Sequence, residues 1–216
     1  MSQVGPTLDH APLILIVDDD EAMRRSTAYL FASVGIETQA FGRADEFLAA
    51  YPDGNSGRPG CIVLDVRMPG MSGLELQRLL AERGCALPIV VVTGHGDVPM
   101  AVAALKTGAH DFIEKPFKEQ HLLDLVEGAL RLSRETIASE SVRHAAEARL
   151  AALAPRERDV LDRVLEGKAN KVIAYELDLS IKTIEAYRAS VMTKMDVGSV
   201  AELARIVAEL RLARPH

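Results

Sequence analysis

Four short, largely apolar runs of this sequence end in side chains that can bind cations or phosphate. In chain order these side chains are Asp18 and Asp19, then Asp65, Thr93 and Lys115. Carboxylates gathered in a small volume repel one another unless a hard cation lies among them, and oxygen ligands suit Mg²⁺. A lysine ammonium and a threonine hydroxyl are suited to phosphate oxygens. An aspartate nucleophile beside Mg²⁺ can form an aspartyl phosphate.

These side chains converge only if the apolar runs are neighbouring strands. Over the first 130 residues, short apolar runs alternate with segments of helical spacing. The expected strands cover 13–17, 36–41, 61–65, 88–93 and 111–113, and the expected helices cover 21–34, 44–51, 73–83, 98–106 and a stretch from about 118 onward. Five strand–helix units predict an α/β fold with a doubly wound, five-stranded parallel sheet. Ligands of such sheets bind at the carboxyl edge, where these runs end.

Four segments at the strand ends resemble the receiver domain of two-component response regulators, in particular the FixJ branch of the FixJ/NarL family. The segments are VDD at 17–19, DVRMPGMSG at 65–73, TGHGDVPMA at 93–101 and DFIEKPF at 111–117. The resemblance covers 13–130 and implies a CheY-like, flavodoxin-like receiver.

The resemblance also implies roles for the residues at the sheet edge. Asp65 matches the phosphoacceptor, and Thr93 and Lys115 match the pair that senses the phosphoryl group. The implied Mg²⁺ ligands are Asp18, Asp19, Asp65 and the backbone carbonyl of Arg67.

Further implied features concern the switch and the dimer. Phe112 matches the switch aromatic that moves inward with Thr93, and the bond before Pro116 is expected to be cis. Regulators of this branch dimerise through the face of the helix 98–106 and the last strand. The implied contacts there are Val102, Lys106 and Asp111.

Simpler explanations stay open for several neighbouring residues. Asp20 and Glu21 are explained by the preference of the first helical turn for acids. Arg67 and His95 either tune the lifetime of the phosphate or are only solvated. Phe112, taken without the resemblance, is an ordinary core residue.

Composition indicates a soluble, globular protein with two different halves. Residues 1–130 carry 10 basic and 18 acidic side chains, whereas residues 131–216 carry 15 basic and 13 acidic ones. The second half therefore tolerates nucleic acid better than the first. No apolar run approaches the ~20 residues that a membrane helix needs, so we expect a cytoplasmic protein without membrane contact. Cys61 and Cys85 lack metal-ligand spacing and are expected to be reduced thiols.

Two segments of the chain are expected to lie outside its domains. Residues 1–12 contain Gly5 and Pro6 and predict a disordered tail. Residues 131–152 continue a helix whose apolar stripe thins, which predicts a helical linker that is either a plain connector or a weakly self-associating coiled coil.

A second, all-α domain is expected from 153 to 216. Helices are predicted over 156–166, 170–177, 181–195 and 200–210, with Pro155 opening the first and Gly167 ending it. Four segments resemble the LuxR-type helix-turn-helix: LAPRERDVL at 153–161, GKANKVIA at 167–174, SIKTIEAYR at 180–188 and MTKM at 192–195. A four-helix, DNA-binding helix-turn-helix domain is implied.

The resemblance implies that one set of polar residues in this domain faces DNA. The set is Lys171, Lys182, Thr183, Arg188 and Lys194, with Glu185 either accepting from a cytosine amine or holding Arg188 in place. Arg188 is the expected base-edge reader, because arginine to guanine is the commonest specific contact. Two departures stand out, Ala154 in place of the usual Ser or Thr cap and Tyr187 in place of the usual His.

The sequence thus indicates a two-component response regulator. A partner histidine kinase is expected to phosphorylate Asp65 with Mg²⁺, which promotes a homodimer that binds promoter DNA and regulates, and by resemblance activates, transcription. RNA polymerase is a further candidate partner. No enzymatic activity is expected beyond the receiver's part in its own phosphoryl transfer and dephosphorylation.

Two other functions use some of the same residues. A Mg²⁺-dependent aspartyl-phosphate phosphatase would want an acid two residues after its nucleophile, where this chain has Arg67. A phosphorylation-independent DNA-binding or adaptor protein would carry a vestigial receiver, yet every signature side chain of the receiver is present.

Overall fold

A computed structural model describes residues 11–94 and 98–212 of the chain. The chain divides into two compact units, Met1–Ala138 and Ser139–His216. The expected tail lies almost entirely outside the described residues, as does His95.

The described part of the first unit contains a five-stranded sheet. Its strands are β1 Leu13–Val17, β2 Glu37–Phe41, β3 Gly60–Asp65, β4 Ile89–Thr93 and β5 Asp111–Glu114. They lie in the order β2-β1-β3-β4-β5, and every neighbouring pair is parallel. This order is the flavodoxin-like one, so the predicted doubly wound parallel sheet is confirmed.

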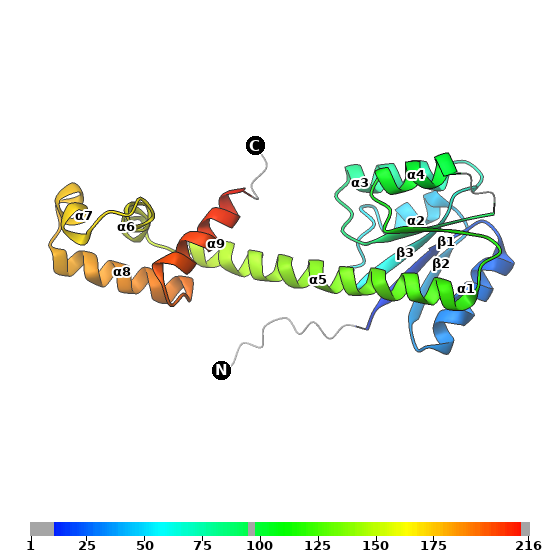
Figure 1. The fold of residues 1–216 in the computed structure, drawn as a ribbon, viewed down its shortest axis with the longest axis horizontal. Coiled ribbons are helices and arrows are strands. Elements are labelled where there is room, and N and C mark those ends of the chain that lie inside the picture. The colour runs from blue at the N-terminus through cyan, green and yellow to red at the C-terminus, as the bar shows by residue number, and fades with distance from the viewer. Residues whose placement is uncertain (1–10, 95–97, 213–216) are drawn as a thin grey trace. The chain divides into compact units, whose positions relative to one another are not determined.

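Helices cover both faces of this sheet. They are α1 Glu21–Ser33, α2 Ala44–Ala50, α3 Gly73–Glu82, α4 Val98–Lys106 and the first part of α5 Glu119–Ala151. Alternate strand residues pack with α2, α3 and α4 on one face, and with α1 and α5 on the other (Figure 1). Because both faces are covered, β1, β3 and β4 are buried throughout, which explains their continuous apolar runs.

Side-chain caps fix the helices that begin beside the carboxyl edge. The Asp20 carboxylate accepts from the backbone N–H groups of Ala22 and Met23, so this residue is the N-cap of α1. At α3, Ser72 and Glu75 form a reciprocal capping box. The caps fix the residues at which α1 and α3 begin, and therefore the ends of the loops after β1 and β3.

Helix α5 packs on the sheet beyond the expected end of the receiver at 130. The Ser133 hydroxyl is 1% exposed and accepts from the backbone N–H of Gly60 at 3.1 Å. The first compact unit correspondingly extends to Ala138.

The second unit contains the last turns of α5 and the helices α6 Pro155–Leu165, α7 Asn170–Leu177, α8 Ile181–Met195 and α9 Val200–Leu212. Asp178 and Asp196 adopt left-handed conformations at the ends of α7 and α8. The predicted inward residues of α8, Ile184, Val191 and Met195, are buried. They belong to two apolar clusters through which α6 packs against α7, α8 and α9.

Candidate functional site

Three charged side chains meet at the carboxyl edge of the sheet. The ammonium of Lys115 lies 2.6 Å from Oδ2 of Asp18 and 2.7 Å from Oδ1 of Asp65. Asp18 follows β1, Asp65 ends β3 and Lys115 follows β5, so the parallel strands of one sheet bring together residues 97 and 50 positions apart. Both carboxylates are about 5–6% exposed.

Burial and charge act in opposite directions on this cluster. Burial raises the pKa of Asp65 above its ordinary value, and the negative charge of Asp18 adds to the rise, although Lys115 and the Arg67 N–H oppose it. Burial also lowers the pKa of Lys115, but the hydrogen bonds to Asp18 and Asp65 outweigh it and leave that pKa raised. The lysine is therefore held as an ammonium between the carboxylates.

The loop after β3 holds the Asp65 carboxylate in place. Its Oδ2 accepts from the backbone N–H of Arg67 at 2.7 Å. The backbone N–H of Gly73 donates to the Val66 carbonyl at 2.9 Å, and a Cβ at position 73 would overlap the Asp65 carbonyl oxygen. A glycine is therefore required where α3 starts, a constraint that the sequence motif contains but does not explain.

Thr93 ends β4, Phe112 lies on β5, and Pro116 follows Lys115 directly. Thr93 is fully buried at the end of β4, and its carbonyl accepts from the Lys115 backbone N–H at 2.7 Å. Phe112 is half-buried and packs against the core cluster of the α3–α4 face. The Lys115–Pro116 peptide bond is cis.

The four expected metal ligands are not equally placed. Asp18 and Asp65 share the Lys115 ammonium, whereas Asp19 and the Arg67 side chain are exposed. Within residues 11–94 and 98–212, no three His, Cys, Asp or Glu side chains are grouped as a metal site. The donor types are nevertheless carboxylate and carbonyl oxygens, which suit Mg²⁺ with several retained waters.

In the second unit, α7 and α8 are joined by a short turn, as in a helix-turn-helix. Lys171 on α7 and Lys182 and Glu185 on α8 are exposed. The Thr183 hydroxyl lies 2.7 Å from the Ser180 hydroxyl, which also accepts from the Thr183 backbone N–H. Thr183 therefore takes part in the cap of α8.

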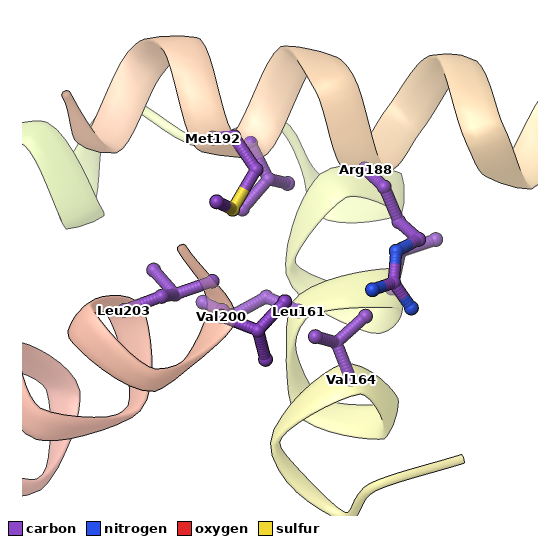
Figure 2. Close-up of a pocket in the computed structure, with 8 residues that line it drawn as sticks. Leu161, Val164, Arg188, Met192, Val200 and Leu203 are labelled. Atoms are coloured by element: carbon purple, nitrogen blue, oxygen red, sulfur yellow. The ribbon is translucent and has the colours of Figure 1, made fainter. Parts of the chain in front are cut away.

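Two of the expected DNA contacts, Arg188 and Lys194, have partners within the domain. Arg188 turns toward α6 and α7, where its guanidinium donates to Oδ1 of Asn170 at 3.0 Å. Figure 2 shows the Arg188 side chain pointing from α8 toward Val164. The Lys194 ammonium lies 2.7 Å from Oε2 of Glu157, which neutralises it within the domain. Arg188 is thus partly buried within the domain, whereas Lys194 stays 42% exposed beside its partner Glu157.

The comparisons with known proteins agree with this geometry. Residues 14–127 match the response regulator receiver domain, and residues 151–207 match the luxR family of bacterial regulatory proteins. The chain is 46% identical over 193 residues to the transcriptional regulatory protein FixJ of Bradyrhizobium diazoefficiens, covering 89% of this chain and 93% of that protein. The chain belongs to the response regulators.

Two solved structures extend this relationship over nearly the whole chain. The response regulator StyR is 40% identical, with a TM-score of 0.82 over 93% of this chain and 100% of the StyR chain. Full-length FixJ from B. japonicum is 45% identical, with a TM-score of 0.56 over 94% of this chain and 98% of the FixJ chain. This response regulator thus combines a receiver with a LuxR-type DNA-binding domain and regulates transcription. The phosphatase and adaptor alternatives are not favoured by these matches.

The expected dimer face of this response regulator lies on α4 and β5. Val102 is 42% exposed, Leu105 is 48% exposed and Lys106 is exposed as well. Asp111 is half-buried, and its carboxylate accepts from the Phe112 backbone N–H at 2.7 Å. An apolar strip therefore accompanies the predicted contacts on α4.

Sequence reasoning missed one buried carboxylate in the DNA-binding domain. Glu157 is 4% exposed and accepts from the Ala154 backbone N–H, the Ser190 hydroxyl and the Lys194 ammonium. These hydrogen bonds, led by the one from Lys194, lower the pKa of Glu157 to about 2. The signal was available, since Glu157 stands at the third helical position of α6, where a capping box places an acid.

None of the helices in the described part of the chain is long and apolar enough to cross a membrane.

Proposed function

We propose that Asp65 of this response regulator accepts a phosphoryl group from a partner histidine kinase. The position of Asp65 supports this proposal, because a buried carboxylate at the carboxyl edge is held 2.7 Å from the Lys115 ammonium. The carboxylate attacks the phosphorus, the bond to the donor nitrogen breaks, and that nitrogen takes up a proton. Lys115 and Thr93 then receive the phosphoryl oxygens, which carry the charge that develops.

The residues at this edge also fit a Mg²⁺ ion. Asp18, Asp19, Asp65 and the Arg67 carbonyl would hold it through oxygen atoms. A bound Mg²⁺ neutralises negative charge on the phosphoryl group. The Lys115 ammonium, held 2.7 Å from Oδ1 of Asp65, is placed to donate to an oxygen of the phosphoryl group.

Phosphorylation acts on transcription through a dimer that binds promoter DNA in the cytoplasm. Thr93 and Phe112 respond to the new charge, and the face with Val102, Lys106 and Asp111 pairs with a second copy. A two-fold dimer reads two half-sites, with Lys171 and Lys182 at phosphates and the exposed face of α8 at the bases. The receiver assists only its own phosphoryl transfer and dephosphorylation.

Light scattering with Mg²⁺ tests this proposal. The wild-type chain is measured with and without acetyl phosphate or beryllofluoride, and Asp65→Asn is measured in parallel. We expect a shift from monomer to dimer in the treated wild type and no shift in the variant. A shift in treated Asp65→Asn contradicts the acceptor assignment, and a constitutive dimer in untreated wild type contradicts the switch.

The dimer face is tested in the same experiment. Val102→Asp places a charge in the exposed apolar strip of α4, so the treated variant should stay monomeric while its phosphorylation, followed by intact mass, is unchanged. Val142→Asp on α5 is the matched control, because Val142 is 72% exposed and lies outside this face. Dimerisation of treated Val102→Asp at the wild-type level contradicts the α4 assignment.

A further inference from the structure

We propose that Arg188 is a positioning residue, which sets the geometry between α7 and α8 through Asn170 and does not read a base. This inference rests on the proposed binding of DNA by the α7–α8 pair. It concerns the packing of α7 against α8 within one domain and replaces the role that the sequence suggested for Arg188.

The spacing of residues along α8 places Arg188 on the inner face of the helix. Arg188 follows Ile184 by four positions and precedes Val191 by three, and both of these residues are buried. Residues three and four apart share one face of a helix. The opposite face carries exposed residues, namely Lys182, Glu185, Ala186 and Ala189.

The contacts of Arg188 agree with this placement. It borders a small apolar pocket together with Leu161 and Val164 of α6 and Met192 of α8 (Figure 2). Its aliphatic stem thus lies among apolar side chains, while its guanidinium donates to Asn170 at 3.0 Å. Asn170 is the first residue of α7, so the hydrogen bond joins the start of one helix to the middle of the other.

The charged hydrogen bond between Arg188 and Asn170 restrains the angle between α7 and α8, and so the angle at which α8 meets DNA. Hydrogen bonds to charged groups are stronger than those between neutral groups. A change in that angle shifts the exposed residues of α8 together relative to the groove. Loss of the contact should therefore weaken binding without changing which base pairs are preferred.

The test compares preferred sequence, affinity and stability in the full-length chain treated with acetyl phosphate and Mg²⁺. Preferred sequences are selected from a library of random duplexes for wild type, Arg188→Ala and Asn170→Ala. Affinity for the selected duplex and for an unrelated duplex is then measured at a temperature well below the unfolding midpoints of all variants. The set is completed by Arg188→Lys, the double variant, and the control Arg205→Ala, whose side chain is exposed on α9 and pairs with Glu209.

We expect each single alanine variant to bind the selected duplex about tenfold more weakly, and the double variant to bind no worse than either. The preferred sequence stays the same in all of them. Arg188→Lys recovers part of the affinity, because its ammonium can still donate to Asn170. Arg205→Ala binds as the wild type does.

Two results overturn the inference. Degeneracy at one base pair in Arg188→Ala, with Asn170→Ala unaffected, identifies Arg188 as a base reader. Lower unfolding midpoints with unchanged affinity reduce Arg188 to a purely structural role. Failure of the wild type to bind any duplex refutes the proposed function itself, which is a distinct outcome.

Discussion

Gly73 lies directly against the backbone carbonyl of Asp65, so that a Cβ at position 73 would overlap the carbonyl oxygen. The neighbour is backbone and cannot rotate away, as the end of a flexible side chain could. We predict that Gly73→Ala displaces Asp65 from Lys115 and slows phosphorylation by acetyl phosphate at least tenfold, on the order of 1.4 kcal/mol of barrier. Intact mass spectrometry over time gives the rate.

Gly198→Ala is the matched control for this substitution. Gly198 precedes α9, and a Cβ there meets only a carboxylate oxygen of Glu202 at 3.9 Å. Its phosphorylation rate should equal that of the wild type. A wild-type rate in Gly73→Ala would show that the loop after β3 can shift without moving the acceptor.

The raised pKa of Asp65 predicts a stability cost at neutral pH. Burial is its main cause, so ionised Asp65 is less favourable in the folded receiver than in the unfolded chain. Asp65→Asn should therefore raise the unfolding midpoint of the receiver at pH 7. The gain should shrink as the pH falls through the raised pKa and past the ordinary value of 3.8, below which wild-type Asp65 is protonated in both states.

Asp53→Asn should have the opposite effect on stability at neutral pH. The backbone N–H of Asn55 lowers the pKa of Asp53, so this carboxylate stabilises the fold above its ordinary pKa. The variant should be slightly less stable than wild type at pH 7, as followed by urea titration of both proteins. A lower midpoint for Asp65→Asn as well would mean that Lys115 compensates fully for the burial of Asp65.

The sheet and the convergence of its strand ends could be predicted because they depend on local patterns. The apolar run Leu13–Val17 is buried on both faces and has no other stable place than the middle of a sheet. Parallel strands end at the same edge of the sheet, which brings Asp18, Asp65 and Lys115 together whatever the details of the loops. The roles of these residues in phosphoryl transfer remain predictions.

The orientation of Arg188 follows from its helical spacing and not from its hydrophilic character. The charge of Arg188 suggests an outward, DNA-facing residue. Its spacing from Ile184 and Val191 instead places it on the inner face of α8. The pairing of Lys194 with Glu157 could not be read from local sequence, since the two residues are 37 positions apart. Such pairs form only after α6 and α8 pack, so local sequence does not specify them.

The buried carboxylate of Glu157 predicts a pH-dependent stability of the DNA-binding domain. Its pKa is lowered to about 2, so its contribution is fully present above the ordinary value of 4.5 and is lost as the pH falls from there toward about 2. Glu157→Gln should increase hydrogen exchange in α6 and α8 at neutral pH. The difference from wild type should diminish over that acid range, as peptide-resolved exchange reports.

Glu209→Gln is the control for this prediction. Glu209 pairs with Arg205 on the exposed surface of α9, where an ion pair contributes at most about 1 kcal/mol. Exchange in α6 and α8 should be unchanged in this variant. Equal protection of both helices in Glu157→Gln and wild type would show that Lys194 and Ser190 do not depend on this carboxylate.

Gln77 predicts a sharp contrast between two substitutions of similar size. It is 1% exposed, and its amide nitrogen donates to the Ala104 carbonyl at 2.8 Å, which joins α3 to the last turn of α4. Its amide oxygen has no hydrogen-bond partner among the described residues. Gln77→Met removes the donor and the unpaired acceptor together. The Ala104 carbonyl still accepts from the backbone N–H groups of Thr107 and Ala109, so the free energy of unfolding should change by no more than about 1 kcal/mol.

Gln77→Glu should instead destabilise the receiver by about 3 kcal/mol or more, because it places a carboxylate against a carbonyl in a buried position. Burial raises the pKa of such an acid, so the loss should lessen as the pH falls and the protonated form donates to Ala104. Urea unfolding at several pH values measures both variants.

Gln39→Glu on exposed β2 is the control, since the new carboxylate can still accept from the Tyr51 hydroxyl and should change stability little. Equal stability of Gln77→Glu and Gln77→Met at pH 7 would mean that water solvates the side chain at position 77 or that α4 shifts away from it. In either case α4 is not anchored to α3 at this point.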